Sequence, residues 1–148
     1  MVQVTSALNS SPSPIPASNI TPKRGAILVV EDRDDVRQGL TQLLELNGFV
    51  VFDAADGEQA LMYLNGGAQP IALVLLDLML DGALSGRDVR AHQLADARLA
   101  TVPTVVVSAC EPDLRARAQL QPDAWLEKPF RFDALLEIVK RFVIPEHS

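Results

Sequence analysis

The sequence predicts an α/β fold in which five helices cover a doubly wound, parallel five-stranded sheet. Five short apolar runs, at 26–30, 50–54, 71–77, 104–108 and 124–127, alternate with segments whose apolar residues recur at helical spacing. The connections between them are short, as in consecutive βα units whose parallel strands are buried on both faces. The right-handed crossover rule and a flavodoxin-like strand order of 2-1-3-4-5 then place the first and third strands side by side.

The helices are marked by caps, stops and apolar faces. We expect Asp34 to cap the first helix and Gly48 to mark its end. The apolar face of this helix has the spacing i, i+4, i+7, i+8. It consists of Val36, Leu40, Leu43 and Leu44. The other four helices are expected over about 57–65, 85–98, 112–120 and 131–142, with Pro112 in the first turn of the fourth.

Composition limits the classes of function. The chain has 148 residues, 48% hydrophobic and 22% charged, which predicts one globular domain with an apolar core. Its net charge of −6 disfavours contact with a phosphate backbone, so we expect no nucleic-acid partner. The single cysteine, Cys110, excludes an internal disulfide, fits a reducing, cytoplasmic location and is expected to be small and buried. No signal peptide or spanning apolar stretch is found, so no membrane association is expected.

The first 24 residues differ in composition from the rest. This segment is rich in Ser, Pro, Asn and Thr, and its few apolar groups cannot offset the entropy cost of ordering it. We therefore predict a disordered leader at 1–24 and a folded domain at 25–148. The alternative for the leader is a docking segment for a partner.

Polar residues stand at the carboxyl ends of several predicted strands. Glu31 and Asp32 follow the first strand, Asp77 closes the third, Ser108 closes the fourth and Lys128 follows the fifth. Since open α/β sheets form their sites at this edge, we expect these side chains to lie together. Three adjacent carboxylates need a cation, and Mg²⁺ fits their oxygen ligands. Lys128 suits a phosphate oxygen, so the set favours phosphoryl transfer to a carboxylate.

Four motifs in order carry a family resemblance. They are ILVVED at 27–32, DLML at 77–80, VSA at 107–109 and WLEKPF at 125–130. On these motifs the chain resembles the receiver domain of two-component response regulators, over about 26–143. The resemblance implies a partner that is a sensor histidine kinase or a histidine phosphotransfer protein, and Mg²⁺ as cofactor.

The resemblance also implies metal and phosphoacceptor roles. Asp77 would be the phosphoacceptor and a metal ligand. Asp32 would bind Mg²⁺ directly, Glu31 would do so through water, and the Met79 main-chain carbonyl would complete the protein ligands. Lys128 would pair with the phosphate.

The remaining implied roles concern the switch. Ser108 would move toward the phosphoryl group, and the Ala109 amide would donate to it. Trp125 stands at the aromatic switch position, and the bond from Lys128 to Pro129 is expected to be cis.

Several positions depart from the usual pattern of the resembled family. Asp81 stands where proline is common, and Gly82 and Ala83 lengthen the following loop. Trp125 is bulkier than the usual aromatic residue. The fourth helix is short, and Gln121 with the proline after it replaces a small Gly-Ala step.

The function implied is that of a stand-alone, chemotaxis-regulator-like receiver that switches the binding of an unknown downstream protein or relays phosphate. It would catalyse only its own phosphorylation and dephosphorylation, and it could form a homodimer. One alternative is a phosphatase of the haloacid dehalogenase type, suggested by Asp32-Arg33-Asp34 after a strand. Another is an interaction module that works without phosphorylation. Asp34 and Asp35 also have a simpler explanation, stabilisation of a helix N-terminus.

Overall fold

The computed structural model describes residues 21–67, 69–110 and 112–146. The predicted leader therefore lies mostly outside the described residues. The strands are β1 (Ala26–Val30), β2 (Val51–Ala54), β3 (Ile71–Asp77), β4 (Thr104–Ser108) and β5 (Ala124–Glu127). The helices are α1 (Asp34–Leu46), α2 (Gly57–Gly66), α3 (Gly86–Ala95), α4 (Ala97–Ala100), α5 (Leu114–Leu120) and α6 (Phe132–Phe142).

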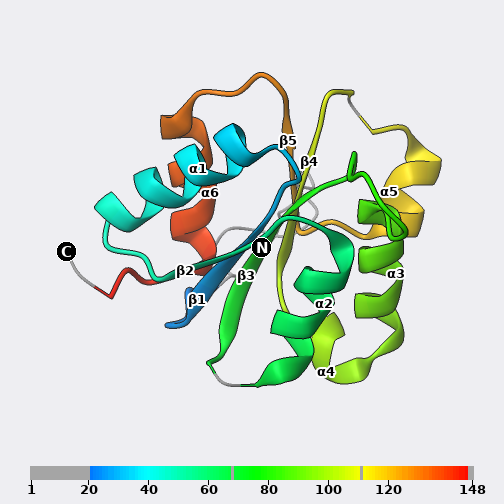
Figure 1. Ribbon diagram of the computed structural model, residues 1–148, viewed down its shortest axis with the longest axis horizontal. Coiled ribbons are helices and arrows are strands. Elements are labelled where there is room, and N and C mark those ends of the chain that lie inside the picture. Colours follow the sequence, from blue (N-terminus) through cyan, green and yellow to red (C-terminus); the bar gives the residue numbers. More distant parts are fainter. Residues whose placement is uncertain (1–20, 68, 111, 147–148) are drawn as a thin grey trace, which may run out of the picture.

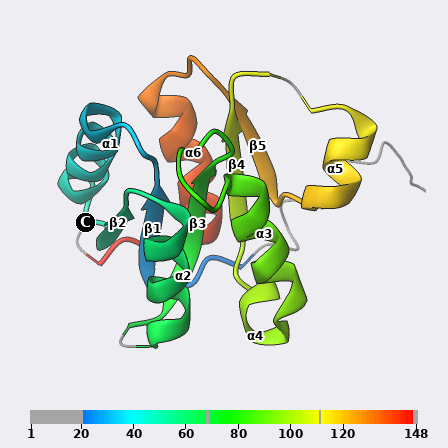
Figure 2. The same ribbon diagram turned by 45° about the vertical axis from the view of Figure 1, so that its right-hand side comes forward.

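The strands form one parallel sheet in the order β2-β1-β3-β4-β5, which confirms the predicted topology. Helices α1 and α6 cover one face, while α2, α3 and α5 cover the other (Figure 1). The turned view in Figure 2 shows the same two helical layers, with α4 directly below α3. The carboxyl ends of the strands are thus left free of the helical layers at one edge of the sheet.

The sheet is buried because both of its faces are apolar. All five residues of β1 and all five of β4 are buried. One apolar cluster joins Leu44 of α1 and Leu135 of α6 to the sheet. A second joins the other face to Val89 of α3. These two layers fix the strand ends against one another.

The structure corrects three helix boundaries. The segment expected as one helix over 85–98 is two helices, because Asp96 takes an extended conformation and caps α4 by accepting a hydrogen bond from the Arg98 amide. The described chain therefore has six helices rather than five. The N-cap of α1 is Arg33, without a side-chain hydrogen bond, and not Asp34. Pro112 lies outside α5, whose cap is Asp113.

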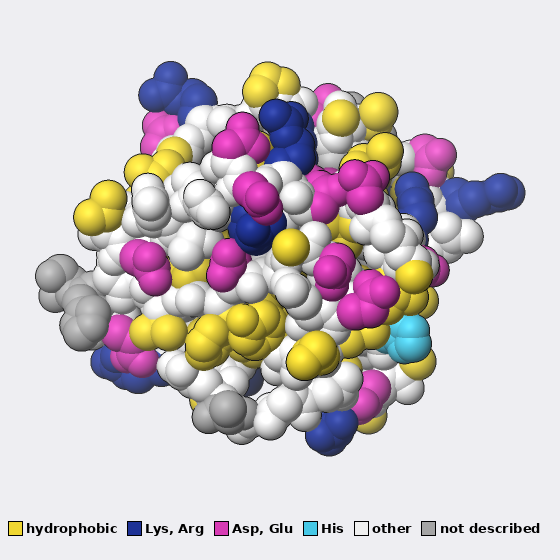
Figure 3. Space-filling model, in the orientation of Figure 1, with side chains coloured by type: hydrophobic (Ala, Val, Ile, Leu, Met, Phe, Trp, Pro, Cys, Tyr) yellow, Lys and Arg dark blue, Asp and Glu magenta, His cyan; other side chains and the backbone are white. Residues whose placement is uncertain are grey.

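Lys23, near the start of the described residues, contacts the chain at the end of α6. The Lys23 amide donates to the Phe142 carbonyl at 2.9 Å, and the Ile144 amide donates to the Lys23 carbonyl at 3.0 Å. The last described residues of the predicted leader thus contact the segment that follows α6. No helix in the described ranges is both long and apolar enough to cross a membrane. Acidic side chains are spread over the face in Figure 3, in keeping with the net charge of −6.

Candidate functional site

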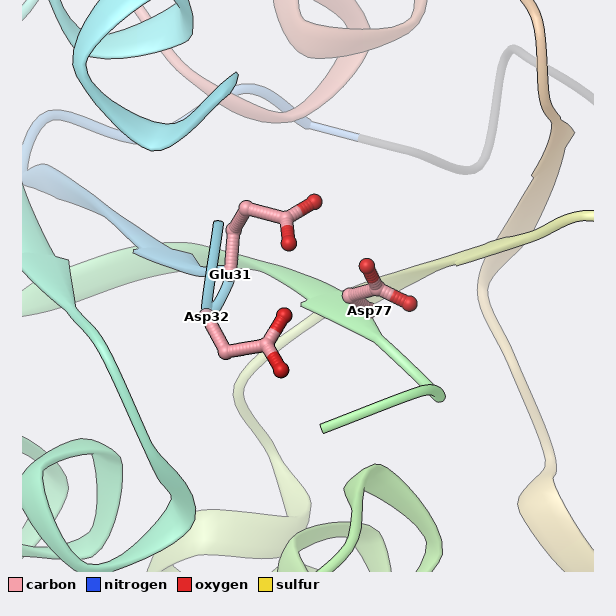
Figure 4. A group of neighbouring side chains, drawn as sticks. All are labelled: Glu31, Asp32 and Asp77. Atoms are coloured by element: carbon pink, nitrogen blue, oxygen red, sulfur yellow. The ribbon is translucent and has the colours of Figure 1, made fainter. Parts of the chain in front are cut away.

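Three carboxylates converge at the carboxyl edge of the sheet, as Figure 4 shows for Glu31, Asp32 and Asp77. One oxygen of each lies within 4.8 Å of the others. The parallel register explains this proximity, since Val30 of β1 pairs with Leu76 of β3. Glu31 and Asp32 follow Val30 directly, and Asp77 follows Leu76. Glu31 and Asp77 are both only 3% exposed. The structure therefore brings together the three acids that the sequence predicted would meet.

Lys128 holds two of these acids. Its Nζ lies 2.6 Å from Asp77 Oδ2 and 3.2 Å from Glu31 Oε1. Its amide donates to the Ser108 carbonyl at 2.8 Å, which fixes its backbone against β4. Burial disfavours the ammonium, but the hydrogen bonds and charges of both carboxylates outweigh it and raise the pKa of Lys128. The peptide bond to Pro129 is cis, as the resemblance implied.

Glu31 is the acid whose charge is most opposed by its surroundings. Burial, together with the adjacent Asp77, raises the pKa of Glu31 from 4.5 to about 7. The Arg33 amide, 3.1 Å from Glu31 Oε2, and the charge of Lys128 oppose this rise. Glu31 can thus hold a proton near neutral pH and release it when a cation arrives.

Backbone amides hold the other two carboxylates. The Met79 amide donates to Asp77 Oδ1 at 2.8 Å, and the Asp81 amide donates to Asp32 Oδ2 at 2.9 Å. Slight burial would raise the pKa of Asp32, but the amide of Asp81 and neighbouring hydrogen bonds outweigh it, so the pKa is lowered. Asp32 therefore stays ionised and offers a charged oxygen to a cation.

The loop after β3 brings the backbone of Gly86 close to the backbone of Leu78, just beyond the strand end. The Gly86 amide donates to the Leu78 carbonyl at 3.3 Å. A Cβ atom at position 86 would lie only 2.6 Å from Leu78 Cα. Only glycine allows this approach without displacing the backbone that carries Asp77.

Ser108 and Trp125 lie on the neighbouring strands β4 and β5. Ser108 ends β4 and is 9% exposed, and its Oγ accepts a hydrogen bond from the Cys110 amide at 3.3 Å. Ala109 is exposed beside it. Trp125 packs in an apolar cluster with Leu120 of α5, and its buried Nε1 finds no acceptor in the described part of the chain. Cys110 is exposed, so its predicted burial was wrong.

Two contacts at the site were missed from the sequence. One is the ion pair between Lys128 and Glu31, and the other is the amide of Asp81 on Asp32. The first depends on how closely the ends of β1 and β5 approach each other across β3 and β4, and the second depends on the path of the loop after β3. Asp81 carried a usable signal, because its departure from the common proline supplies the N–H that proline lacks.

The family assignment agrees with this geometry. The sequence model of the response regulator receiver domain family matches residues 27–140. The chain therefore belongs to this family and is a receiver domain of the two-component response regulators.

Curated relatives support the same family. The alkaline phosphatase synthesis transcriptional regulatory protein SphR of Synechococcus elongatus is 36% identical over 113 residues. The phosphate regulon transcriptional regulatory protein PhoB of Escherichia coli is 34% identical over 117 residues. These alignments cover 70% and 77% of this chain but 43% and 49% of the relatives. The chain thus spans about half the length of these curated relatives.

Solved structures of receivers share the fold. A receiver domain of a Francisella response regulator superposes with a TM-score of 0.68 at 25% identity, covering 79% of this chain and 94% of that one. The response regulator TrrA of Thermotoga maritima, in complex with Mg²⁺ and BeF, gives 0.67 at 28% identity, covering 78% and 96%.

Proposed function

We propose that Asp77 accepts a phosphoryl group from a phosphohistidine of a sensor histidine kinase or of a histidine phosphotransfer protein. The observation that carries this proposal is the placement of its carboxylate. Asp77 is buried at the end of β3, beside two further acids and 2.6 Å from Lys128 Nζ. A carboxylate so placed is a nucleophile whose product would meet a fixed positive charge.

The transfer needs positioning and charge neutralisation more than acid–base chemistry. An Asp77 oxygen forms a bond to phosphorus while the phosphorus–nitrogen bond to the donor histidine breaks. Lys128 already contacts Asp77 Oδ2, so a small displacement of its ammonium would place it on a phosphoryl oxygen. The contact of Lys128 Nζ with Glu31 Oε1 at 3.2 Å also keeps the ammonium beside Asp77.

The acidic cluster fits Mg²⁺. Its donors are hard oxygens within 4.8 Å of one another, and Lys128 balances only part of their charge. Asp32, Asp77 and the Met79 carbonyl would hold the ion, with Glu31 acting through water. Bound there, Mg²⁺ supplies neutralisation of the charge on the transferred oxygens. The Mg²⁺ complex of TrrA supports this assignment.

The response would pass from Ser108 to Trp125. The Ser108 hydroxyl would turn toward the phosphoryl group, to which the Ala109 amide would also donate. The buried Nε1 of Trp125 has no acceptor in the described chain, and this unsatisfied donor opposes the present position of the side chain. A shift of Ser108 would then alter the packing of Trp125 on α5 and change the binding of a downstream protein, or the phosphate would be relayed onward.

Mass spectrometry and fluorescence test the proposal together. With Mg²⁺ and a small phosphodonor such as acetyl phosphate, the chain should gain one phosphoryl group, and the fluorescence of Trp125, its single tryptophan, should change. Asp77→Asn should show neither change. A wild-type mass that stays constant would exclude the phosphoacceptor role, whereas turnover of a generic phosphate ester would indicate a phosphatase.

A further inference from the structure

A buried arginine lies away from the acidic cluster and has no part in its chemistry. Arg90 of α3 is only 2% exposed. Its guanidinium reaches α5, where Nε donates to the Leu120 carbonyl at 2.7 Å and Nη2 donates to the Gln121 carbonyl at 2.6 Å. These carbonyls belong to the end of α5, where a helix leaves its last acceptors without intrahelical partners. Arg90 thus caps α5 from a neighbouring helix.

The capped end is conformationally unusual. Gln121 has φ 45° and ψ 53°, and it is the only non-glycine residue with positive φ in the described chain. This left-handed conformation costs free energy in a residue with a side chain, and it needs surrounding contacts to hold it. The hydrogen bond from Arg90 to the Gln121 carbonyl is such a contact.

The same guanidinium is tied to the sheet. Arg90 Nη1 donates to Gln93 Oε1 at 3.1 Å and to Thr104 Oγ1 at 3.0 Å. The Thr104 amide donates to Asp123 Oδ2 at 2.8 Å, and the Asp123 amide donates back to the Thr104 carbonyl at 2.9 Å. The network therefore joins α3, the first residue of β4 and the turn from α5 into β5. We call Arg90, Gln93, Thr104 and Asp123 the Arg90 network.

The other end of α5 is held far less. In the described part of the chain, the side-chain cap of its N-terminus is Asp113, which accepts a hydrogen bond from the Ala116 amide at 2.7 Å. Leu114 is 87% exposed, and Arg115 and Arg117 are exposed as well. Few buried contacts and an exposed backbone are features of segments that open at low free-energy cost.

We propose that the Arg90 network is a fixed pivot that confines the response of α5 to its N-terminal turn. This regulatory proposal rests on the proposed function, because it concerns what moves when Asp77 is phosphorylated. The N-terminal turn follows Ser108 by a few residues, whereas the far end is tied to α3 and to β4. A change at Ser108 then tilts the first turn of α5 and leaves the turn into β5 in place.

Amide hydrogen exchange, resolved by residue, tests the pivot. The full chain is compared with Mg²⁺ alone and with Mg²⁺ plus beryllofluoride as a phosphoryl mimic. We expect exchange to change at 114–117 and to stay constant at Asp123, whose amide donates to the Thr104 carbonyl at 2.9 Å. Exchange should also stay constant at Gln121, whose amide donates to the Arg117 carbonyl at 2.9 Å and whose carbonyl is held by Arg90. Equal changes at both ends in the wild-type chain would overturn the proposal.

Substitutions separate the pivot from the rest of the fold. Arg90→Met keeps the apolar stem and removes the donors, so exchange at Gln121 and Asp123 should rise at least about tenfold without any activation. The mimic should then alter both ends of α5. Arg87→Met is the matched control, because Arg87 is exposed on the same helix, and it should leave both ends as in the wild type. Unchanged protection at Gln121 in Arg90→Met would contradict the pivot.

Two further measurements keep failures distinguishable. Arg90→Lys retains the positive charge but not the planar guanidinium with its several donors. It should therefore increase amide exchange at Gln121, and it provides this test even if Arg90→Met does not fold. Phosphorylation is followed separately by mass. If the mass does not change, the proposed function fails, while the exchange of the unphosphorylated variants still decides whether Arg90 anchors α5.

Discussion

Two buried polar clusters of this receiver differ in the partners that their charged groups have. At the acidic cluster, three carboxylates share one ammonium, that of Lys128. In the Arg90 network, the single guanidinium has four hydrogen-bond acceptors, and the nearest carboxylate, that of Asp123, lies 3.9 Å away. The first cluster has more carboxylates than cationic partners, which suits the cation and the phosphoryl group that we propose for it, while the guanidinium of the second is directed at acceptors within the protein. An excess of like charge therefore marks the proposed functional site, and a buried, hydrogen-bonded guanidinium marks a structural anchor.

The largest effect, on the rate of phosphorylation, is expected from removing the Lys128 ammonium beside the acidic cluster. Lys128→Met should slow phosphorylation by a small phosphodonor about 100-fold or more, because it removes a preorganised charge from the phosphoryl oxygens. The rate is measured by mass at saturating Mg²⁺. Lys140→Met on α6, which is exposed, serves as the control and should retain the wild-type rate. A rate in Lys128→Met close to wild type would assign Lys128 to structure alone.

A substitution in the Arg90 network should lower the stability of the fold and leave the rate of phosphorylation unchanged. Thr104→Val leaves buried donors of Arg90 and Gln93 short of an acceptor, so the free energy of unfolding should fall by about 2 kcal/mol. Urea unfolding measures this change. Thr101→Val at an exposed threonine should cost less than about 0.5 kcal/mol. Phosphorylation of Thr104→Val should proceed at the wild-type rate, and a large loss of rate would break the contrast between the two clusters.

The pH dependence of stability should be set by the acidic cluster. The pKa of Glu31 is raised from 4.5 to about 7 by burial and by Asp77. The folded chain thus binds this proton more tightly than the unfolded chain, so its contribution to stability is present below 4.5 and is lost as the pH rises through about 7. Without Mg²⁺, urea unfolding should show lower stability at about pH 8 than at about pH 5 for this reason. Glu31→Gln should weaken this dependence of stability on pH. An unchanged pH dependence in Glu31→Gln would show that the protonation of Glu31 is not its cause.

The smallest effect concerns loss of the phosphoryl group. Met79 is 72% exposed beside Asp77, and neither it nor Cys110 offers a polar side chain that could orient an attacking water efficiently. We therefore predict that the phosphorylated chain loses phosphate slowly. Met79→Asn should shorten its lifetime severalfold, since a carboxamide can position water. Release of inorganic phosphate measures both lifetimes, and a wild-type lifetime of seconds would refute the prediction.

The sequence predicted the acidic cluster better than the Arg90 network for a physical reason. Glu31, Asp77 and Lys128 follow strands whose apolar runs are evident locally, and parallel topology then brings their ends together. Arg90 lies at a buried position of α3 that apolar periodicity would assign to a hydrophobic residue. Its partners come from β4 and from the turn after α5, so only the packed structure reveals them. The break between α3 and α4 was missed similarly, because it depends on the local conformation of Asp96.

The central claim is that Asp77 forms the acyl phosphate, and its direct test is the site of modification. The chain is treated with Mg²⁺ and acetyl phosphate, the acyl phosphate is trapped by borohydride reduction, and the peptides are sequenced by mass spectrometry. The account predicts that aspartate is reduced at Asp77 alone and that the reduction disappears in Asp77→Asn. Reduction at Asp32 or Glu31 with Asp77 intact, or no reduction at all, would contradict it.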